Sequence, residues 1–444
     1  MRSKNFLLAC FVFLLGVFSE TKVYFYGTLA IAEILVFVIA PIIFAADYKK
    51  LSYDGFLPFL FALLLVTFGM LASSWYNKTP LPFLIKQSAV IYSVFAYYVV
   101  FHRLLRNNYN LLGVYFVGVA ISTIIIIFIF NPQASLSASG SAYIGNAEVD
   151  DIVEGPLFWA YRLKSFGSLP FYMMYLKTPI FYVIFAPIAY IAFIMLTTIS
   201  GRSASISFLL AGALMLVGGK SRRSMAKIGR HLIRYCILGV VLLFSYKILY
   251  KVAAQNDLLG EEARTKYETQ TKHGDSFLKM LMAGRGEFFV GLMAVCDRPI
   301  MGFGPHAIDR NGYWEKFLIK YGDWEDLQYY YGLRAAAGNA DSTIPSHSCI
   351  IGAWHKYGIL GLFFYIYVLW LMIDQVKRYM HFIPQWYGYF SLTISSYVWS
   401  IFFSGFSGRH LFALFMVTLF FARAIGHRRL QLPIDMELEA RKYE

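Results

Sequence analysis

Charged residues are scarce in this chain of 444 residues: Asp, Glu, Lys and Arg make up 15% of it, against 58% hydrophobic and 18% aromatic residues. Soluble domains contain about 25% charged residues, so the composition excludes a soluble globular protein. The sequence also lacks the alternating segments of about ten residues that build a transmembrane barrel. Its apolar residues gather instead in runs of about 20, the length at which an α-helix spans a bilayer. We therefore predict an all-α polytopic membrane protein whose first partner is the lipid bilayer.

Acidic residues are fewer than basic ones, which gives a formal net charge of +14. The basic residues are not spread evenly but gather in short polar connections, at 49–50, 102–106, 220–234, 377–378 and 427–429. Cytoplasmic loops of membrane proteins have this character under the positive-inside rule. The charge therefore indicates membrane topology, and no nucleic-acid partner is expected.

Only four cysteines are present, and no cluster of carboxylates or of Cys and His has the spacing of a metal site. Cys10 and Cys236 lie in apolar runs, as buried small hydrophobic residues do. Cys296 and Cys349 both fall near the outer side and could pair in an oxidising compartment. Nothing in their spacing fixes disulfide geometry, so two free thiols are expected. We expect neither a metal nor another cofactor.

Threading the chain through a membrane gives about twelve spans and one large polar loop. The basic stretch 220–234 strongly opposes translocation. Keeping it inside requires the weak segment 166–176 to cross as well, with both termini then cytoplasmic. We expect residues 1–444 to form a single membrane domain, and residues 251–350 to form a large, mainly helical loop on the outer side, with helix-compatible stretches at 275–282 and 288–296. The expected spans are 6–18 (an uncleaved first span), 27–46, 56–72, 85–101, 111–130, 166–176, 178–198, 203–218, 235–250, 351–373, 386–403 and 411–424.

Polar residues on the outer side are the candidates for chemistry. Arg202 lies at the mouth of a span, Arg285 lies between Gly284 and Gly286, and His347 precedes a helix expected to begin near Cys349. A helix N-terminus disfavours the imidazolium, so His347 would stay neutral and could act as a base.

Each of these residues also has a simpler explanation. Arg202 could snorkel to the headgroups, Arg285 could be a solvated arginine in a turn, and His347 could cap the helix. Aromatic residues between 313 and 331 could stack on sugars or anchor the loop at the membrane interface. Glu33, inside the second span, could serve a site or pair with a neighbouring helix.

Taken in order, these elements resemble the bacterial O-antigen ligase and O-antigen polymerase superfamily. The resemblance covers residues 162–364. It departs from the family at His347-Ser348, where His-Asn is frequent, and at His355-Lys356, where an acidic residue often precedes the Gly-Ile-x-Gly turn. The matching elements are Arg162 with Gly167, Gly201-Arg202-Ser203, Gly284-Arg285, the turn Pro299-Ile300-Met301-Gly302-Phe303-Gly304-Pro305, His347, and Gly358-Ile359-Leu360-Gly361-Leu362.

The resemblance implies transfer of a glycan from undecaprenyl pyrophosphate to an acceptor hydroxyl on the periplasmic side of the bacterial inner membrane. Arg202 and Arg285 would bind the pyrophosphate, because a guanidinium binds phosphate oxygens in a bidentate manner and stays charged. His347 would be the general base of a metal-independent, inverting reaction. Further candidates are Arg162, Glu287 and Arg409, of which Arg409 is expected on the outer side.

Two alternatives stay open. A ligase delivers the glycan to lipid A-core, whereas an O-antigen or exopolysaccharide polymerase uses the same donor to extend a lipid-linked glycan. A twelve-span transporter or lipid-glycan flippase is the alternative from another class; it would favour paired charges near the membrane midplane.

Overall fold

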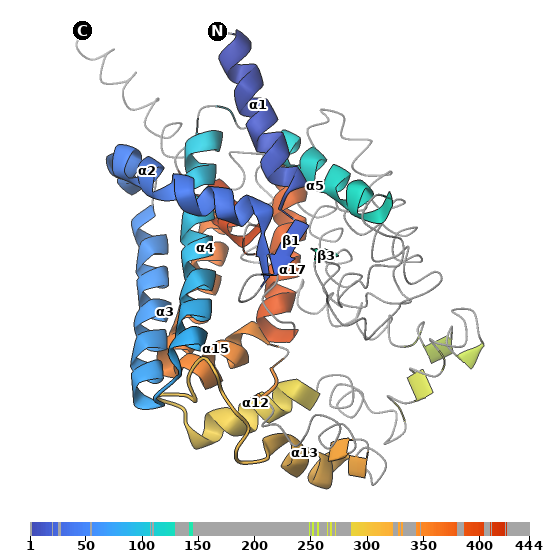
Figure 1. The fold of residues 1–444 in the computed structure, drawn as a ribbon. Helices are drawn as coiled ribbons and strands as arrows, with labels where there is room; N and C mark the ends of the chain where they lie inside the picture. The colour runs from blue at the N-terminus through green and yellow to red at the C-terminus, as the bar shows by residue number, and fades with distance from the viewer. Residues whose placement is uncertain are drawn as a thin grey trace, which may run out of the picture.

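The computed structural model is a helical bundle with additional short helices at one end (Figure 1). It describes residues 2–19, 21–24, 28–53, 56–106, 108, 111–128, 142–144, scattered positions between 248 and 271, 286–322, 327–328, 330–331, 343–346, 348–379, 386–403, 409, 411–421 and 423. The elements are α1 (Arg2–Val17), β1 (Thr21–Tyr24), β2 (Thr28–Ala30), α2 (Ile31–Tyr53), α3 (Phe56–Tyr76), α4 (Leu81–Leu105), α5 (Leu111–Phe128), β3 (Ala142–Ile144), α12 (Gly286–Asp297), α13 (Tyr313–Tyr321), α15 (Cys349–Tyr357), α16 (Ile359–Tyr379) and α17 (Tyr387–Phe403).

The apolar helices indicate a membrane-embedded protein. Within the described ranges, three helices are long and apolar enough to cross a membrane: Ile31–Leu51, Phe56–Tyr76 and Leu81–Leu105. Shorter apolar helices are Phe6–Val17, Leu111–Ser122, Ile359–Gln375 and Leu411–Phe421. All of them coincide with predicted spans. The predicted spans between 166 and 250 lie outside the described residues, as does the stretch 275–282.

The described fold is mainly helical, as predicted, and carries one small sheet that the sequence did not reveal. Strand β1 pairs antiparallel with β2 and parallel with β3, in the order β2-β1-β3. The second span was predicted to begin at residue 27, but β2 occupies residues 28–30 and α2 begins at Ile31. Strands of three or four residues are too short to leave a periodic hydrophobic pattern, so the sequence did not reveal them.

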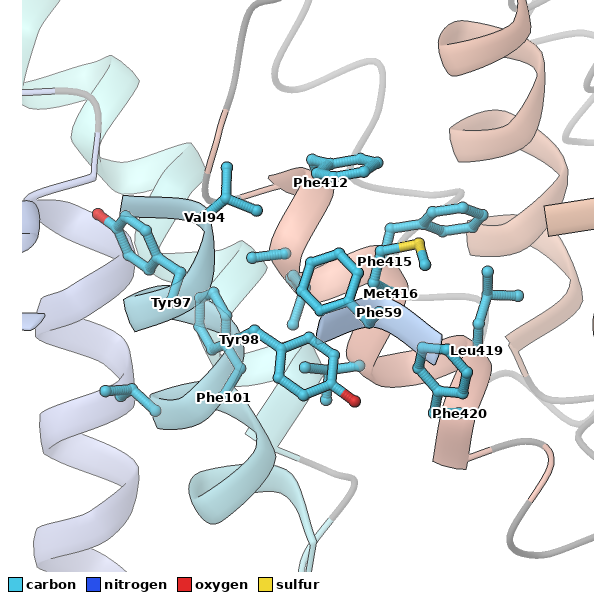
Figure 2. Close-up of a cluster of buried hydrophobic side chains, with 14 of the residues drawn as sticks. Phe59, Val94, Tyr97, Tyr98, Phe101, Phe412, Phe415, Met416, Leu419 and Phe420 are labelled. Carbon is cyan, nitrogen blue, oxygen red and sulfur yellow. The ribbon is translucent and has the colours of Figure 1, made fainter. Parts of the chain in front are cut away.

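Close packing of aromatic side chains holds the bundle together. Figure 2 shows Phe59 of α3 and Tyr98 of α4 facing Phe415 and its neighbours on the helix Leu411–Phe421. The rings of Phe59 and Tyr98 stack with centroids 4.6 Å apart. Lipid tails are as apolar as these side chains, so the helices gain stability from van der Waals contact rather than from excluding water. Small residues serve the same purpose where α1 crosses α5, because a Cβ on Gly16 would overlap the Tyr115 carbonyl.

Lys50 and Arg103 lie together at one end of the bundle. Asp47 near the end of α2 accepts from Lys50 at 3.0 Å and from Arg103 of α4 at 2.9 Å. Helix α16 runs antiparallel to α3, since the rings of Phe61 and Tyr367 lie 5.5 Å apart and Gly69 faces Leu360. The last turn of α16, which contains residues 377–378, therefore lies toward the same end as Arg103. The opposite end holds α12, α13 and α15 (Figure 1).

One predicted span is interrupted. Residues 351–373 were expected to form a single helix, but the chain breaks at Gly358, whose φ is +67°, and the short helix α15 precedes α16. The Pro299–Pro305 turn packs into this break. The N–H of Ile359 donates to the Ile300 carbonyl at 3.0 Å, and the N–H of Phe303 donates to the His355 carbonyl at 2.7 Å. A Cβ on Gly358 would overlap the Ile300 carbonyl, so only glycine fits this position.

Replacing Gly358 by alanine is expected to destabilise the protein. The Gly358→Ala variant combines a strained left-handed backbone with a clash against fixed backbone atoms, so we expect a loss of at least about 2 kcal/mol of unfolding free energy. Thermal unfolding in detergent measures it. Gly113→Ala is the matched control, because a Cβ there meets nothing within 4 Å. Equal melting temperatures for the two variants would contradict the assigned role of Gly358.

Candidate functional site

The three main site residues that the sequence predicts, Arg202, Arg285 and His347, lie outside the described residues, as does the further candidate Arg162. The structure does describe the chain on both sides of His347 and the helix that follows Arg285. It also describes the remaining candidates Glu287, Arg409 and Glu33. The frame around the predicted site can therefore be built from its parts.

Helix α12 begins at Gly286, directly after Arg285, in agreement with the helical stretch predicted for 288–296. A Cβ on Gly286 would lie 2.9 Å from the ring of Phe317 and 3.4 Å from that of Trp314, both on α13. The missing side chain thus allows α12 and α13 to approach closely. Glu287 lies in the first turn of α12, where a carboxylate interacts favourably with the helix dipole.

Helix α15 begins at Cys349, so the predicted helix start behind His347 is confirmed. Ser348 is its N-cap: the hydroxyl accepts from the N–H of Ile351 at 3.3 Å and donates to the Ile401 carbonyl of α17 at 2.9 Å. Asn and Ser are about equally good N-caps, so the departure from His-Asn to His347-Ser348 preserves the cap. The Ser346 hydroxyl donates to the Ser348 carbonyl at 2.9 Å, which tightens the chain on the other side of His347.

The two helix starts belong to one packed unit. A Cβ on Gly291 of α12 would lie 2.8 Å from the Ile351 side chain and 3.4 Å from the Pro345 carbonyl. Gly291 is about 1.4 turns from Gly286, about 7.5 Å along the helix axis. Cys296 of α12 is exposed and Cys349 of α15 is buried, and the two do not form a disulfide, as predicted.

Polar contacts order the rest of this unit. Asp309 accepts from the N–H groups of Tyr313 at 2.8 Å and Trp314 at 3.2 Å, which caps α13. The Tyr313 hydroxyl donates to Asp297 at the end of α12 at 2.5 Å and accepts from Asn311 at 2.7 Å. Burial, together with the Asp297 carboxylate, raises the pKa of Tyr313 to about 12. Tyr313 is only 2% exposed, so this aromatic residue packs within the loop and cannot stack on a sugar.

The loop between α3 and α4 ties the turn to the bundle. The Asn77 side-chain amide donates to the Gly302 carbonyl at 3.1 Å, and Arg298 donates to the Asn77 side-chain oxygen at 3.0 Å. The Ser73 hydroxyl donates to the Lys356 carbonyl at 2.7 Å. Sequence reasoning missed Ser73 and Asn77. The available signal was two polar residues at the end of an apolar run, one helical turn apart.

His355 and Lys356, which stand where an acidic residue is frequent in the family, lie in different environments. His355 is fully buried, and burial, with a smaller contribution from the charge of Lys356, lowers its pKa to about 3, so its ring is neutral. Neither of its ring nitrogens has a hydrogen-bond partner. Lys356 is only half-buried. The departure from the family pattern therefore places one uncharged ring and one cation at this end of α15.

Glu33 and Arg409, which the sequence offered separately, form an ion pair with 3.3 Å between Arg409 Nη1 and Glu33 Oε1. The same carboxylate accepts from the Ser93 hydroxyl at 2.8 Å and from the Ala30 N–H at 2.9 Å. Ser93 is at the midpoint of the 25-residue helix α4. The Glu33–Arg409 pair therefore lies level with the middle of α4. The pairing with a neighbouring helix, one of the two alternatives for Glu33, is confirmed.

Within the described residues, no group of three or more His, Cys, Asp or Glu side chains could hold a metal ion. The described frame offers instead two helix N-termini, buried backbone hydrogen bonds and the Glu33–Arg409 pair. These groups can orient a loop and bind an anion.

Truncating either member of the ion pair is expected to destabilise the protein. Glu33→Ala leaves Arg409 with an unpaired charge at mid-depth, and we expect each single substitution to lower the unfolding free energy by about 2–4 kcal/mol. The double variant should lose less than the sum, with a coupling energy of about 1–3 kcal/mol. Thermal unfolding of all four proteins measures the cycle. Lys50→Ala is the control, because Lys50 pairs with Asp47 from a half-exposed position. Additive effects would contradict the pairing.

Comparison with models of protein families and with curated proteins returns no match for this chain. The resemblance described above thus depends on the order and spacing of short motifs. The physical case for a function depends on the packing of α12, α15 and the Pro299–Pro305 turn.

Proposed function

We propose that the protein is a membrane glycosyltransferase of the O-antigen ligase type. It transfers a glycan from undecaprenyl pyrophosphate to an acceptor hydroxyl, without a metal and with inversion at the sugar carbon. The observation that carries the proposal is the packing of α12 on α15 at the end of the bundle opposite the basic end. This packing brings together the chain segments that directly adjoin Arg285 and His347.

The frame suits a pyrophosphate leaving group. The first N–H groups of a helix have no partner within the helix and can bind an anion, with the helix dipole adding to the attraction. At α15 one of them, the Ile351 N–H, already donates to the Ser348 cap. Helix α12 begins directly after Arg285, and α15 begins two residues after His347. In the proposal, Arg202 and Arg285 bind the pyrophosphate, with Arg162 and Glu287 as further candidates near them.

The proposed chemical step is a direct displacement. His347 accepts the proton of the acceptor hydroxyl as its oxygen attacks the anomeric carbon. The bond from that carbon to the phosphate oxygen breaks, and the pyrophosphate leaves with the electron pair. The arginines neutralise the charge that develops on it. A neutral histidine is needed at the start, and the N-terminus of α15 favours that form.

The proposed topology completes the assignment. The basic end, where Lys50 and Arg103 share Asp47, faces the cytoplasm together with both termini. About twelve spans cross the bacterial inner membrane, and residues 251–350 form the periplasmic loop. The donor is then reached from the periplasmic side, where the acceptor, lipid A-core or a growing glycan, is also found.

The first test is transfer by purified, reconstituted protein supplied with an undecaprenyl-pyrophosphate-linked glycan and lipid A-core. We expect His347→Ala to reduce the rate about 10²–10⁴-fold, the contribution of a general base. Arg285→Ala and Arg202→Ala should each reduce it about 10²–10³-fold, because a developing charge loses its partner. Arg310→Ala is the matched control, since Arg310 is exposed on the same loop. Near-normal turnover of folded His347→Ala would contradict the proposed mechanism.

The products separate the two transferase types. One glycan joined to lipid A-core identifies a ligase, whereas longer lipid-linked chains with unmodified core identify a polymerase.

A transporter or flippase is a second candidate because of one observation. Paired charges near the midplane are typical of transport pathways, and the Glu33–Arg409 pair lies level with the midpoint of α4. Flippase activity would appear as movement of the lipid-linked glycan between leaflets without transfer, and Glu33→Gln would reduce it.

The proposed topology is tested by labelling Cys296, which is exposed at the end of α12. In a variant whose other cysteines are replaced, a membrane-impermeant maleimide should label Cys296 in cells with an intact inner membrane. Lys50→Cys in a cysteine-free background is the control at the opposite end, where the Lys50 side chain is 51% exposed. It should react only after the inner membrane is disrupted. The reverse labelling pattern would invert the topology.

A further inference from the structure

Two lysines flank the contact between the start of α4 and the end of α15. The Tyr357 hydroxyl donates to the Gln87 side-chain oxygen at 2.8 Å, which fixes the two helices against each other. Lys86 and Lys356 are the chain neighbours of this pair, and the charge of Lys86 acts on Lys356.

Backbone and ring contacts make this a built position rather than a chance approach of surface side chains. The Lys356 carbonyl accepts from the N–H of Gly304 at 2.9 Å and from the Ser73 hydroxyl at 2.7 Å, so its backbone is held on two sides. One turn earlier on α4, the Phe83 ring stacks on His306 with centroids 3.5 Å apart. Phe83 and Gln87 are four residues apart and therefore lie on the same face of α4. The end of α15 and the start of α4 are thus each held in place by contacts of their own.

Among the described residues, the two cations have no acidic partner. No carboxylate in the described part of the chain forms an ion pair with Lys86 or Lys356. Lys356 is half-buried, and burial followed by the charge of Lys86 lowers its pKa. Burial of a cation beside a like charge is unfavourable, and a bound anion would remove the penalty.

The surroundings of Lys86 are those of a lipid rather than of a free ion. Leu81 and Ile85, which precede Lys86 on α4, are 65% and 59% exposed, and Trp75 at the end of α3 is 88% exposed. Ile300 of the turn is 66% exposed. Exposed tryptophan at a helix end is typical of the membrane interface, the level at which phospholipid phosphates lie. Apolar side chains around a cation fit an anion that carries acyl chains.

We propose that Lys86 and Lys356 together bind the headgroup phosphate of an anionic phospholipid, whose acyl chains cover Leu81 and Ile85. This site lies at the end of α15 remote from His347 and does not depend on the proposed transferase activity. Two lysines at one phosphate provide charge-assisted hydrogen bonds from different helices, so the lipid would clamp α4 to α15. Because Lys356 precedes the break at Gly358, the lipid would also stabilise the packing of the Pro299–Pro305 turn into that break.

The test measures thermal stability of the purified full-length protein in neutral detergent during titration with phosphatidylglycerol. Phosphatidylcholine of the same acyl chains and inorganic phosphate are titrated in parallel. We expect phosphatidylglycerol to raise the melting temperature and the other two to have little effect. In a Lys86→Gln, Lys356→Gln double variant, the concentration for half-maximal stabilisation should rise at least about tenfold. Lys320→Gln, an exposed lysine on α13, is the matched control and should behave as wild type.

A charge reversal keeps the test independent of folding defects. Lys86→Glu would place a carboxylate beside Lys356, so this variant should be at least as stable as wild type without lipid yet no longer respond to phosphatidylglycerol. A wild-type response in the double variant would overturn the proposal, and so would equal stabilisation by phosphatidylcholine. Equal stabilisation by inorganic phosphate would overturn the lipid as the ligand.

Discussion

The break at Gly358 is the constraint on which the loop end of the molecule depends. In an uninterrupted helix the carbonyls of His355 and Lys356 would accept from N–H groups four residues later. With Gly358 at φ +67°, these carbonyls accept instead from Phe303 and Gly304, and Ile359 donates to Ile300. Backbone groups near or within a membrane must find partners inside the protein, because lipid offers none. The helix break and the Pro299–Pro305 turn therefore require each other.

This exchange of hydrogen bonds positions the candidate site. The turn follows α12 directly, so docking it at Gly358 sets where α12 ends, while Gly291 sets how closely α12 packs on α15. The same break lets α15 turn away from α16, so that its N-terminus meets α17 through Ser348 and Ile401. Two helices whose starts adjoin Arg285 and His347 are thus fixed by glycines that lie elsewhere in the chain. The motif glycines, such as Gly358, therefore contribute by letting backbone segments pack closely. Contacts with a ligand would be made by the residues next to them.

The apolar helices could be predicted from sequence because their composition reflects the bilayer directly, and α3 was expected at 56–72 and observed at Phe56–Tyr76. The break at Gly358 was missed, although His355-Lys356 and the Gly-Ile-x-Gly motif interrupt the apolar run there, because its physical reason, the Ile300 carbonyl, lies 58 residues away in sequence. Glu33 and Arg409 were each noticed, but 376 residues separate them and neither has a local signal for the other. Ser348 shows the opposite case: its capping role is local, and the helix start behind His347 was predicted correctly.

Most of the charged clusters described above contain both an acidic and a basic residue. At the basic end, Lys50 and Arg103 share the Asp47 carboxylate, and at mid-depth Glu33 neutralises Arg409. Cations on the translocated side of a membrane protein run against the insertion preference that places basic residues in the cytoplasm. On the proposed topology, Lys86 and Lys356 are such cations, and they lack the acidic partner that the other described clusters possess. A cation placed against that preference needs a compensating interaction. Lys86 has exposed apolar residues near it in the chain, so a lipid phosphate is the partner that fits both its charge and its surroundings.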